Sequence, residues 1–179
     1  MRAVGTEIPD VRARAFAALD VLAGDARGLG IALSGGGDSV ALMHLAAEWA
    51  ARRGCRLAAA TVDHGLRPES ATEAAAAGAA AARLGLPHQV LHWQAGGASG
   101  NLMANARQAR LDLLAGWARG QGLDAVALGH TRDDLAETLL MRLARGAGID
   151  GLAAMAARRR DHGMIWLRPL LEVGRERSE

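Results

Sequence analysis

The first residues suited to chemistry lie in a glycine-rich segment between an apolar run and a helical pattern, Ser34-Gly35-Gly36-Gly37-Asp38-Ser39. Three successive glycines let the backbone turn tightly and approach a ligand, while the amides at a helix N-terminus attract anions. The segment therefore predicts a pyrophosphate site, to which the hydroxyls of Ser34 and Ser39 can donate. The structural alternative is an ordinary turn in which Asp38 caps the helix.

Two common nucleotide-binding loops do not fit this segment. The sequence contains no lysine, so it lacks the Gly-Lys-Ser/Thr end of the P-loop. The dinucleotide loop has spaced glycines in the pattern Gly-x-Gly-x-x-Gly, whereas Gly35, Gly36 and Gly37 are contiguous and are followed by an acid. Both of those nucleotide folds are therefore disfavoured.

A second polar segment runs from Gly129 to Thr138 and joins a predicted strand to a predicted helix. Ligands of open α/β folds bind at the carboxyl ends of the strands. Asp133 and Glu137 are four positions apart and share one helical face, where two carboxylates repel each other unless a cation or ligand lies between them. Helix capping is the alternative for Asp133 and Asp134, because the helix dipole favours acids in the first turn.

Three further segments carry polar residues. The turn Val62-Asp63-His64-Gly65-Leu66-Arg67 follows the second predicted strand, which places it beside the nucleotide site unless it is only a polar turn. Arg107 and Arg110 share one side of a predicted helix and suit phosphates or carboxylates, with a solvated arginine face as the alternative. The run Arg158-Arg159-Arg160 is interpreted as a solvated surface, with an RNA backbone contact as the alternative.

The elements that must position these residues alternate between short apolar runs and longer helical patterns, which is typical of βαβ units. We therefore expect an α/β fold, with an open parallel five-stranded sheet and helices on both faces. The predicted strands are Gly30 to Leu33, Leu57 to Val62, His88 to His92, Asp124 to Leu128 and Ile165 to Leu167. The predicted helices are Asp38 to Arg53, Glu69 to Leu84, Asn101 to Arg119 and Arg132 to Ala144, with a further one over Val11 to Leu22.

Composition agrees with one globular domain. The 179 residues are 50% hydrophobic, which is enough for a sizeable core, and the formal net charge of +2 is weak support for a nucleic-acid partner. Cys55 is the single cysteine, so we expect no internal disulfide and a reducing cytoplasm. The sequence shows no signal peptide and no apolar run of the roughly 20 residues needed to cross a bilayer, so no membrane partner is expected.

The segment Ser34 to Ser39 resembles the signature Ser-Gly-Gly-x-Asp-Ser of the PP-loop ATP pyrophosphatase family, and it matches at every position. The resemblance implies a Rossmann-like fold of the adenine nucleotide alpha hydrolase type. It also implies that ATP is cleaved between its α and β phosphates. In that family the loop holds the pyrophosphate and an acid at the place of Asp38 binds Mg²⁺.

The pattern His-x-x-Asp-Asp-x-x-Glu-Thr resembles the PP-loop enzymes that modify tRNA cytidines, and the segments Arg145 to Leu152 and Arg168 to Leu171 resemble the tRNA(Ile)-lysidine synthetase family. That family adenylates the wobble cytidine of a tRNA(Ile) with a CAU anticodon and then joins free L-lysine to it. The resemblance implies nucleotide contacts from the loop and from Val62, His64 and Gly129. It implies catalytic roles for Asp38, Arg107, His130, Asp133, Asp134 and Glu137.

The resemblance extends from about Gly30 to Leu171. Members of the family continue into domains that grip tRNA, so we expect 1–179 to be a catalytic domain truncated at its C-terminus, with a homodimer among the expected assemblies. Met103 and Leu111 depart from the family, which has Glu or Gln and Tyr there. Two alternatives remain: an inert nucleotide-binding module, and a tRNA cytidine thiolation enzyme, although Cys55 alone cannot supply the cysteine pair that such enzymes use.

Overall fold

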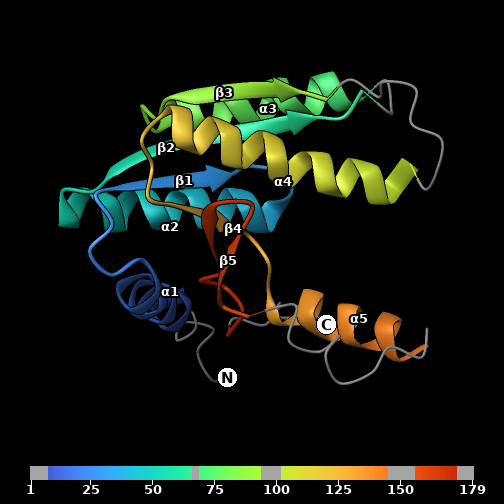
Figure 1. The fold of residues 1–179 in the computed structure, drawn as a ribbon. Coiled ribbons are helices and arrows are strands. Elements are labelled where there is room, and N and C mark those ends of the chain that lie inside the picture. The colour runs from blue at the N-terminus through green and yellow to red at the C-terminus, as the bar shows by residue number, and fades with distance from the viewer. Residues whose placement is uncertain (1–7, 66–68, 94–101, 145–155, 173–179) are drawn as a thin grey trace, which may run out of the picture.

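The computed structural model describes residues 8–65, 69–93, 102–144 and 156–172 and has three layers, with a central sheet between two layers of helices (Figure 1). The strands occur in the order β3-β2-β1-β4-β6-β5 across the sheet. The elements are α1 Ile8–Ala23, β1 Gly28–Ala32, α2 Gly37–Arg53, β2 Arg56–Asp63, α3 Ser70–Arg83, β3 His88–His92, α4 Leu102–Gly120, β4 Ala125–Leu128, α5 Arg132–Ala144, β5 Arg158–Asp161 and β6 Met164–Leu167.

The five predicted strands and five predicted helices are all present, with ends within a few residues of the predicted ones. The α/β prediction is confirmed, and β1, β2, β3, β4 and β6 pair in parallel. The motif segment 145–152 and the turn residues 66 and 67 lie outside the described residues.

The predicted strand number was wrong by one, because Arg158–Asp161 forms β5, antiparallel to β6 at the edge of the sheet. A two-residue turn joins the pair, and His162 and Gly163 there both have positive φ, of 52° and 68°, as in a tight hairpin. Three successive arginines lack the apolar alternation of a half-buried strand. They suit an edge strand, where charged side chains discourage pairing with other chains.

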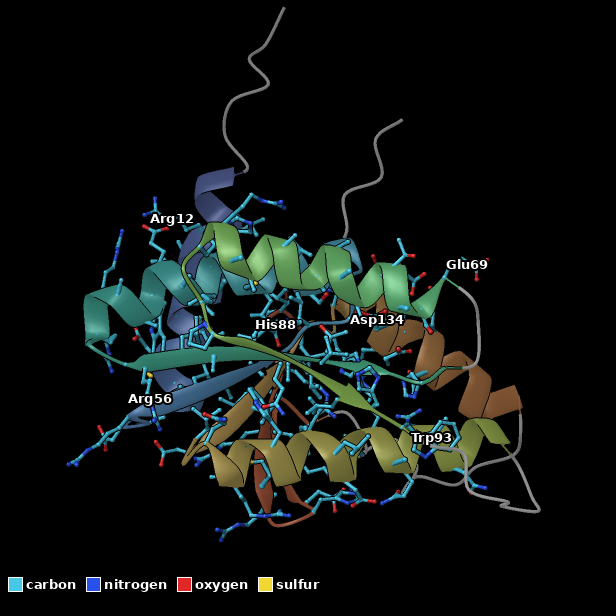
Figure 2. The ribbon with its side chains drawn as sticks, turned by 90° about the horizontal axis from the view of Figure 1, so that it is seen from above. Arg12, Arg56, Glu69, His88, Trp93 and Asp134 are labelled. Atoms are coloured by element: carbon cyan, nitrogen blue, oxygen red, sulfur yellow. The ribbon has the colours of Figure 1, made fainter. Side chains whose placement is uncertain are left out.

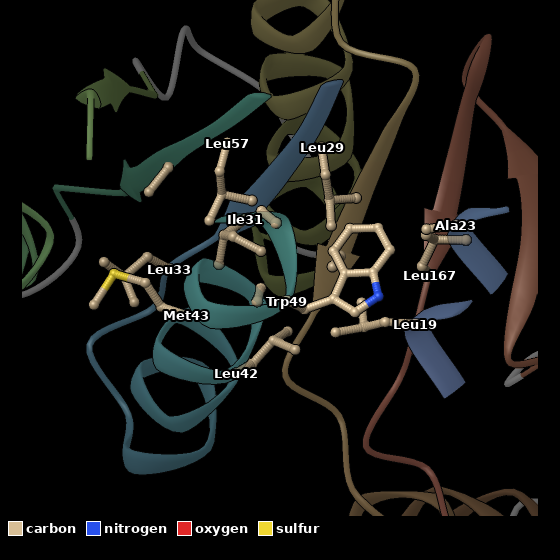
Figure 3. Close-up of a cluster of buried hydrophobic side chains, with 14 of the residues drawn as sticks. Leu19, Ala23, Leu29, Ile31, Leu33, Leu42, Met43, Trp49, Leu57 and Leu167 are labelled. Carbon is tan, nitrogen blue, oxygen red and sulfur yellow. The ribbon is translucent and has the colours of Figure 1, made fainter. Parts of the chain in front are cut away.

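The core is divided by the sheet into two clusters because successive residues of β1 point to opposite faces. Leu29 and Ile31 pack with Leu42 and Trp49 of α2 and with α1 in the first cluster (Figure 3). Ala32 belongs to the second cluster, which contains residues of α4, β4 and β6. The central strand is thus buried on both faces and holds its carboxyl end, where the glycine-rich loop starts, in a fixed position.

In the described residues, none of the helices is both long enough and apolar enough to span a membrane.

The packing of β1 against α4 predicts opposite effects for two glycine substitutions. A Cβ atom at Gly30 would lie 2.8 Å from Cζ3 of Trp117, so Gly30→Ala should lower the free energy of unfolding by about 1 to 3 kcal/mol. Gly116 in α4 has no atom within 4 Å of such a Cβ, so Gly116→Ala should raise it by up to about 1 kcal/mol. Denaturant unfolding measures both. Equal effects of the two substitutions would contradict this account of the β1–α4 contact.

Candidate active site

The glycine-rich loop between β1 and α2 is held by its two serines. Ser39 is buried, and its hydroxyl donates to the carbonyl oxygen of Gly36 at 2.8 Å while accepting from the Ser34 amide at 3.2 Å. The two serine Oγ atoms are 3.1 Å apart. Gly35 has φ of +83°, a conformation that favours glycine. The serines therefore shape the loop, and the amides at the N-terminus of α2 make this end of the helix suited to an anion.

The end of β4 lies directly against this loop. A Cβ atom at Gly129 would be 2.8 Å from both the amide nitrogen and the Cα of Ser39, and 3.0 Å from the carbonyl carbon of Asp38. Backbone atoms cannot move aside as a flexible side chain can, so only glycine fits there. Gly129 thus brings the segment that starts at His130 beside the loop.

Three adjoining hollows lie at this end of the sheet, and two of them are lined by residues of the loop. An apolar hollow of about 440 Å³ lies between β1, β2, α3 and α4, and a loop hollow of about 220 Å³ lies over the glycine-rich loop. A charged hollow of about 510 Å³ lies between α4, α5 and the β5–β6 hairpin. Arg110 lines all three, so they form one composite site. Figure 2 shows Glu69, Trp93 and Asp134 on the side of His88 away from Arg56, with Asp134 nearer to the centre of the view than the other two.

The apolar hollow contains the two residues predicted to contact a nucleotide, Val62 and His64. The His64 ring lies edge-on to Trp93, with 6.1 Å between ring centroids. Its Nδ1 atom is buried and has no hydrogen-bond partner in the described part of the chain. Burial, and then the charge of Arg110, lower the pKa of His64. The hollow therefore offers apolar walls and an uncharged ring nitrogen, which suit a flat heterocycle.

The loop hollow brings together most of the residues predicted from the two main motifs. Asp38 and Asp134 both line it, although they are far apart in the sequence. Among the described residues, no group of three or more His, Cys, Asp or Glu side chains could hold a metal ion. Mg²⁺ commonly takes only one or two carboxylates together with phosphate oxygens. This pair of acids therefore fits Mg²⁺ bound with a phosphate chain. The predicted site residues lining the loop hollow are Ser34, Gly36, Asp38, Ser39, Gly129, His130 and Asp134.

The charged hollow contains more arginine than its acids balance. The pKa of Arg110 is lowered by burial and then by Arg107, and the pKa of Arg168 is lowered by burial and then by Arg159 and Arg107. Arg159 pairs with Asp161 at 2.8 Å. Arg168 is only 9% exposed. Such a concentration of arginines, two of which are at least partly buried, favours an anionic ligand. Its charged lining is Arg107, Arg110, Arg159, Arg168, Asp134, Glu137 and Asp161.

The acids of α5 differ in their roles: Asp134 caps the helix, and Asp134 and Glu137 line the charged hollow. Oδ2 of Asp134 accepts from the Thr131 amide at 2.7 Å and from the Thr131 hydroxyl at 3.0 Å, so Asp134 caps the helix in the manner of a capping box. Asp134 and Glu137 both line the charged hollow, whereas Asp133 is not among its lining residues. The structure thus groups Glu137 with Asp134 rather than with Asp133, the acid predicted to share its face.

His130 lines both the loop hollow and the charged hollow. The Nε atom of Arg168 donates a hydrogen bond to its Nδ1 atom at 3.1 Å. Burial, followed by the charges of Arg168 and Arg110, lowers the pKa of His130 to about 4. The ring is therefore uncharged at neutral pH.

Arg110, which its spacing from Arg107 had indicated as suited to phosphates or carboxylates, lines all three hollows. Arg159 and Arg168 of the charged hollow were not among the predicted catalytic or binding residues. Arg168 reaches His130 from the far end of the chain, and no local pattern indicates that contact. Ser70 and Glu73 of α3 also line the apolar hollow without a sequence signal.

Residues 11–179 match the family model described as a PP-loop domain. The chain belongs to the PP-loop domain family. Membership of this ATP-using family implies a use of ATP by this chain as well.

Curated relatives extend this comparison. The chain is 57% identical over 150 residues to the tRNA(Ile)-lysidine synthase of Ruegeria pomeroyi, which covers 84% of this chain and 36% of that protein. It is 54% identical over 149 residues to the tRNA(Ile)-lysidine synthase of Rhodopseudomonas palustris, covering 82% and 43%. The PP-loop chain thus spans less than half the length of these relatives.

Solved structures show the same fold. The U34-tRNA thiolase NcsA from Methanococcus maripaludis, solved with its [4Fe-4S] cluster, superposes with a TM-score of 0.79 at 21% identity, over 93% of this chain and 59% of that one. The NH3-dependent NAD synthetase from Campylobacter jejuni superposes with a TM-score of 0.56 at 16% identity, over 93% and 66%. At these identities the likeness concerns the fold alone.

The low pKa of His130 predicts a pH-dependent contribution to stability. The folded-state pKa of about 4 lies below the ordinary value of 6.5, so the unfolded chain binds the proton more strongly and stability falls as the pH drops through this window. His130→Gln should remove this loss. As the pH falls from 6.5 to about 4, the free energy of unfolding of the variant should therefore rise relative to that of the wild type, by up to about 3 kcal/mol. Urea unfolding at several pH values measures it, with His44→Gln at an exposed position of α2 as the control. Parallel curves for wild type and His130→Gln would contradict the assignment.

Proposed function

We propose that this chain is the catalytic part of a tRNA(Ile)-lysidine synthase, which uses ATP to join free L-lysine to C2 of the wobble cytidine of a tRNA(Ile) with a CAU anticodon. The observation that carries the proposal is the identity of 57% over 150 residues to a protein of that name, together with 54% over 149 residues to another. The single Cys55 supports a reducing cytoplasm as its compartment.

ATP is placed across the apolar and loop hollows in this proposal. The adenosine would lie in the apolar hollow beside Val62 and His64, and the β and γ phosphates would lie on the first amides of α2. Arg110 lies where the two hollows meet, which suits a contact with the α phosphate. The nucleotide would thereby present its α phosphorus toward the charged hollow.

Adenylation follows from that placement. The O2 atom of cytidine attacks the α phosphorus, and the bond to the bridging oxygen breaks so that pyrophosphate leaves onto the loop. Asp38 and Asp134 are the residues that would hold Mg²⁺ here, and the ion supplies charge neutralisation to the departing pyrophosphate. Arg107 and Arg110 would stabilise the charge of the phosphoryl group from the other side.

Lysine transfer uses the charged hollow. The ε-amine of lysine attacks C2 of the adenylated cytidine, and AMP leaves with the former O2 atom. A lysine ammonium must be bound and must lose a proton before it attacks, and the carboxylates of Asp134 and Glu137 line the hollow where this occurs. We also propose a supporting role for Asp133, whose charge lies in the same first turn of α5.

A tRNA thiolation activity is the second candidate, because a U34-tRNA thiolase shares the fold. That thiolase carries a [4Fe-4S] cluster, and such clusters are held by several cysteine thiolates. Cys55 is the one cysteine of this sequence and lies next to the amino end of β2, whereas the composite site lies at the carboxyl ends of the strands. The lysidine proposal is therefore favoured.

The test is mass analysis of tRNA nucleosides after incubation of the protein with ATP, Mg²⁺, tRNA(Ile) and each of the twenty amino acids in turn. Lysidine should form with lysine, and pyrophosphate should be released. Asp38→Asn, which keeps the side-chain shape but removes the charge, should lower adenylation at least about 100-fold, because a loop carboxylate would be lost. Thiolated cytidine, or ATP binding without pyrophosphate release, would support the thiolase or the inert module instead.

Glu137→Gln should separate the two steps. Glu137 is exposed in the charged hollow and does not line the loop hollow, so its loss should slow lysine transfer about 10- to 100-fold and leave adenylation nearly unchanged. Adenylated tRNA should then accumulate and be trapped by rapid quenching. Glu48→Gln is the matched control, because it is the same substitution on α2, at a residue that lines none of the three hollows. An equal loss in both steps for Glu137→Gln would assign that residue to ATP, Mg²⁺ or the fold.

A further inference from the structure

Arg168 lies at the end of β6 with its guanidinium held between two acceptors. Its Nη1 atom donates to the carbonyl oxygen of Ala156 at 2.9 Å, and its Nε atom donates to Nδ1 of His130 at 3.1 Å. The Arg168 amide also donates to the carbonyl oxygen of Ala157 at 2.8 Å. The side chain is 9% exposed. Arg168 is thus fixed by the start of the β5–β6 hairpin and points its Nε–H at His130.

This contact determines where the imidazole carries its proton. An arginine guanidinium stays protonated and can only donate, so Nδ1 of His130 must be the acceptor and carries no proton. A neutral imidazole with an unprotonated Nδ1 has its proton on Nε2. The lowered pKa of His130, to about 4, agrees with this neutral form.

The Nε2–H group is available to a ligand. Within the described part of the chain, Arg168 is the hydrogen-bond partner found for the His130 ring, and it uses Nδ1. His130 lines both hollows where phosphoryl transfer would occur, next to Arg107 and Arg110. Neither ring nitrogen can accept a proton from a substrate, because Nδ1 is engaged and Nε2 already carries one. The contact with Arg168 therefore makes His130 a hydrogen-bond donor and excludes it as a general base.

We propose that Arg168 is a positioning residue that fixes His130 as a neutral hydrogen-bond donor, whose Nε2–H contacts a non-bridging oxygen of the α-phosphoryl group during adenylation. The catalytic half of this inference rests on the proposed function. An uncharged donor adds a hydrogen bond to the developing charge without adding a fourth cation beside Arg107, Arg110 and Arg168. A neutral imidazole used as an electrophile in this way is a known solution in enzyme sites.

The protonation state is tested by ¹⁵N NMR of the histidine side chains in the unliganded protein, with the His130 signals assigned by their loss in His130→Gln. Nε2 should be protonated and Nδ1 unprotonated at neutral pH, and this state should persist to about pH 5. Arg168→Met, and Arg168→Lys as a second variant that keeps the charge, should both allow the Nδ1–H tautomer to appear. A wild-type His130 with its proton on Nδ1, or one that titrates near pH 6.5, would overturn the inference without any activity measurement.

The donor role is tested by two amide substitutions with different reach. The amide nitrogen of glutamine can occupy the place of Nε2, whereas that of asparagine reaches only the place of Nδ1. Pyrophosphate release should fall less than about 10-fold in His130→Gln and at least about 100-fold in His130→Asn. Equal large losses would indicate proton transfer at Nε2 and would overturn the donor role.

The kinetics of Arg168→Met test whether Arg168 positions His130 or only stabilises the fold. Its kcat for pyrophosphate release should fall with little change in the KM for ATP. The acid limb of its pH profile should move to higher pH, because one of the charges that lower the pKa of His130 is removed while burial and Arg110 remain. A uniform loss with an unchanged pH profile would show that Arg168 is only structural. If the wild type releases no pyrophosphate with tRNA, both the proposed function and the donor role of His130 are wrong. The NMR measurement tests the tautomer of His130 independently of that result.

Discussion

The carboxyl end of β4 lies so close to the first turn of α2 that no side chain fits between them. A Cβ atom at Gly129 would be 2.8 Å from the backbone of Ser39, and this contact is the constraint on which the site depends. It places the glycine-rich loop, the proposed anion site, beside the segment that carries His130 and Asp134. The parallel pairing of β1 with β4 makes that approach possible, because adjacent parallel strands end at the same edge of the sheet.

Electrostatics then divides the composite site into regions with different chemistry. The apolar hollow has few charged groups and an uncharged His64, whereas the charged hollow carries four arginines. Burial and the neighbouring arginines lower the pKa values of Arg110, Arg168 and His130. In the proposed binding mode, a phosphate chain that runs from the loop past Arg110 would relieve this repulsion. Asp134 and Glu137 of α5 line the same charged hollow, where the proposal places the lysine ammonium.

The strands, the helices and the two main motifs could be predicted because each depends on neighbours in the sequence. The apolar runs identified the strands that are buried on both faces, and the glycines marked the loop that follows β1. The strand β5 was missed because its arginines have no periodicity, and it exists only through pairing with β6. Sequence reasoning placed Asp133, rather than Asp134, on the same helical face as Glu137. The direction of α5 and the contact of Thr131 with Asp134 determine which of them lines the hollow.

The sequence by itself determined the fold class, the glycine-rich turn after β1 and the acids at the start of α5, because local backbone preferences and hydrophobic periodicity fix these features. Only the tertiary structure decided the protonation of His130, which requires burial and an arginine from a distant strand. It also decided that Arg110 joins the three hollows, since that depends on how α4 lies across the sheet. Charge and solvation act through space rather than along the chain, so the chemistry of these side chains is set by contacts that no local pattern records.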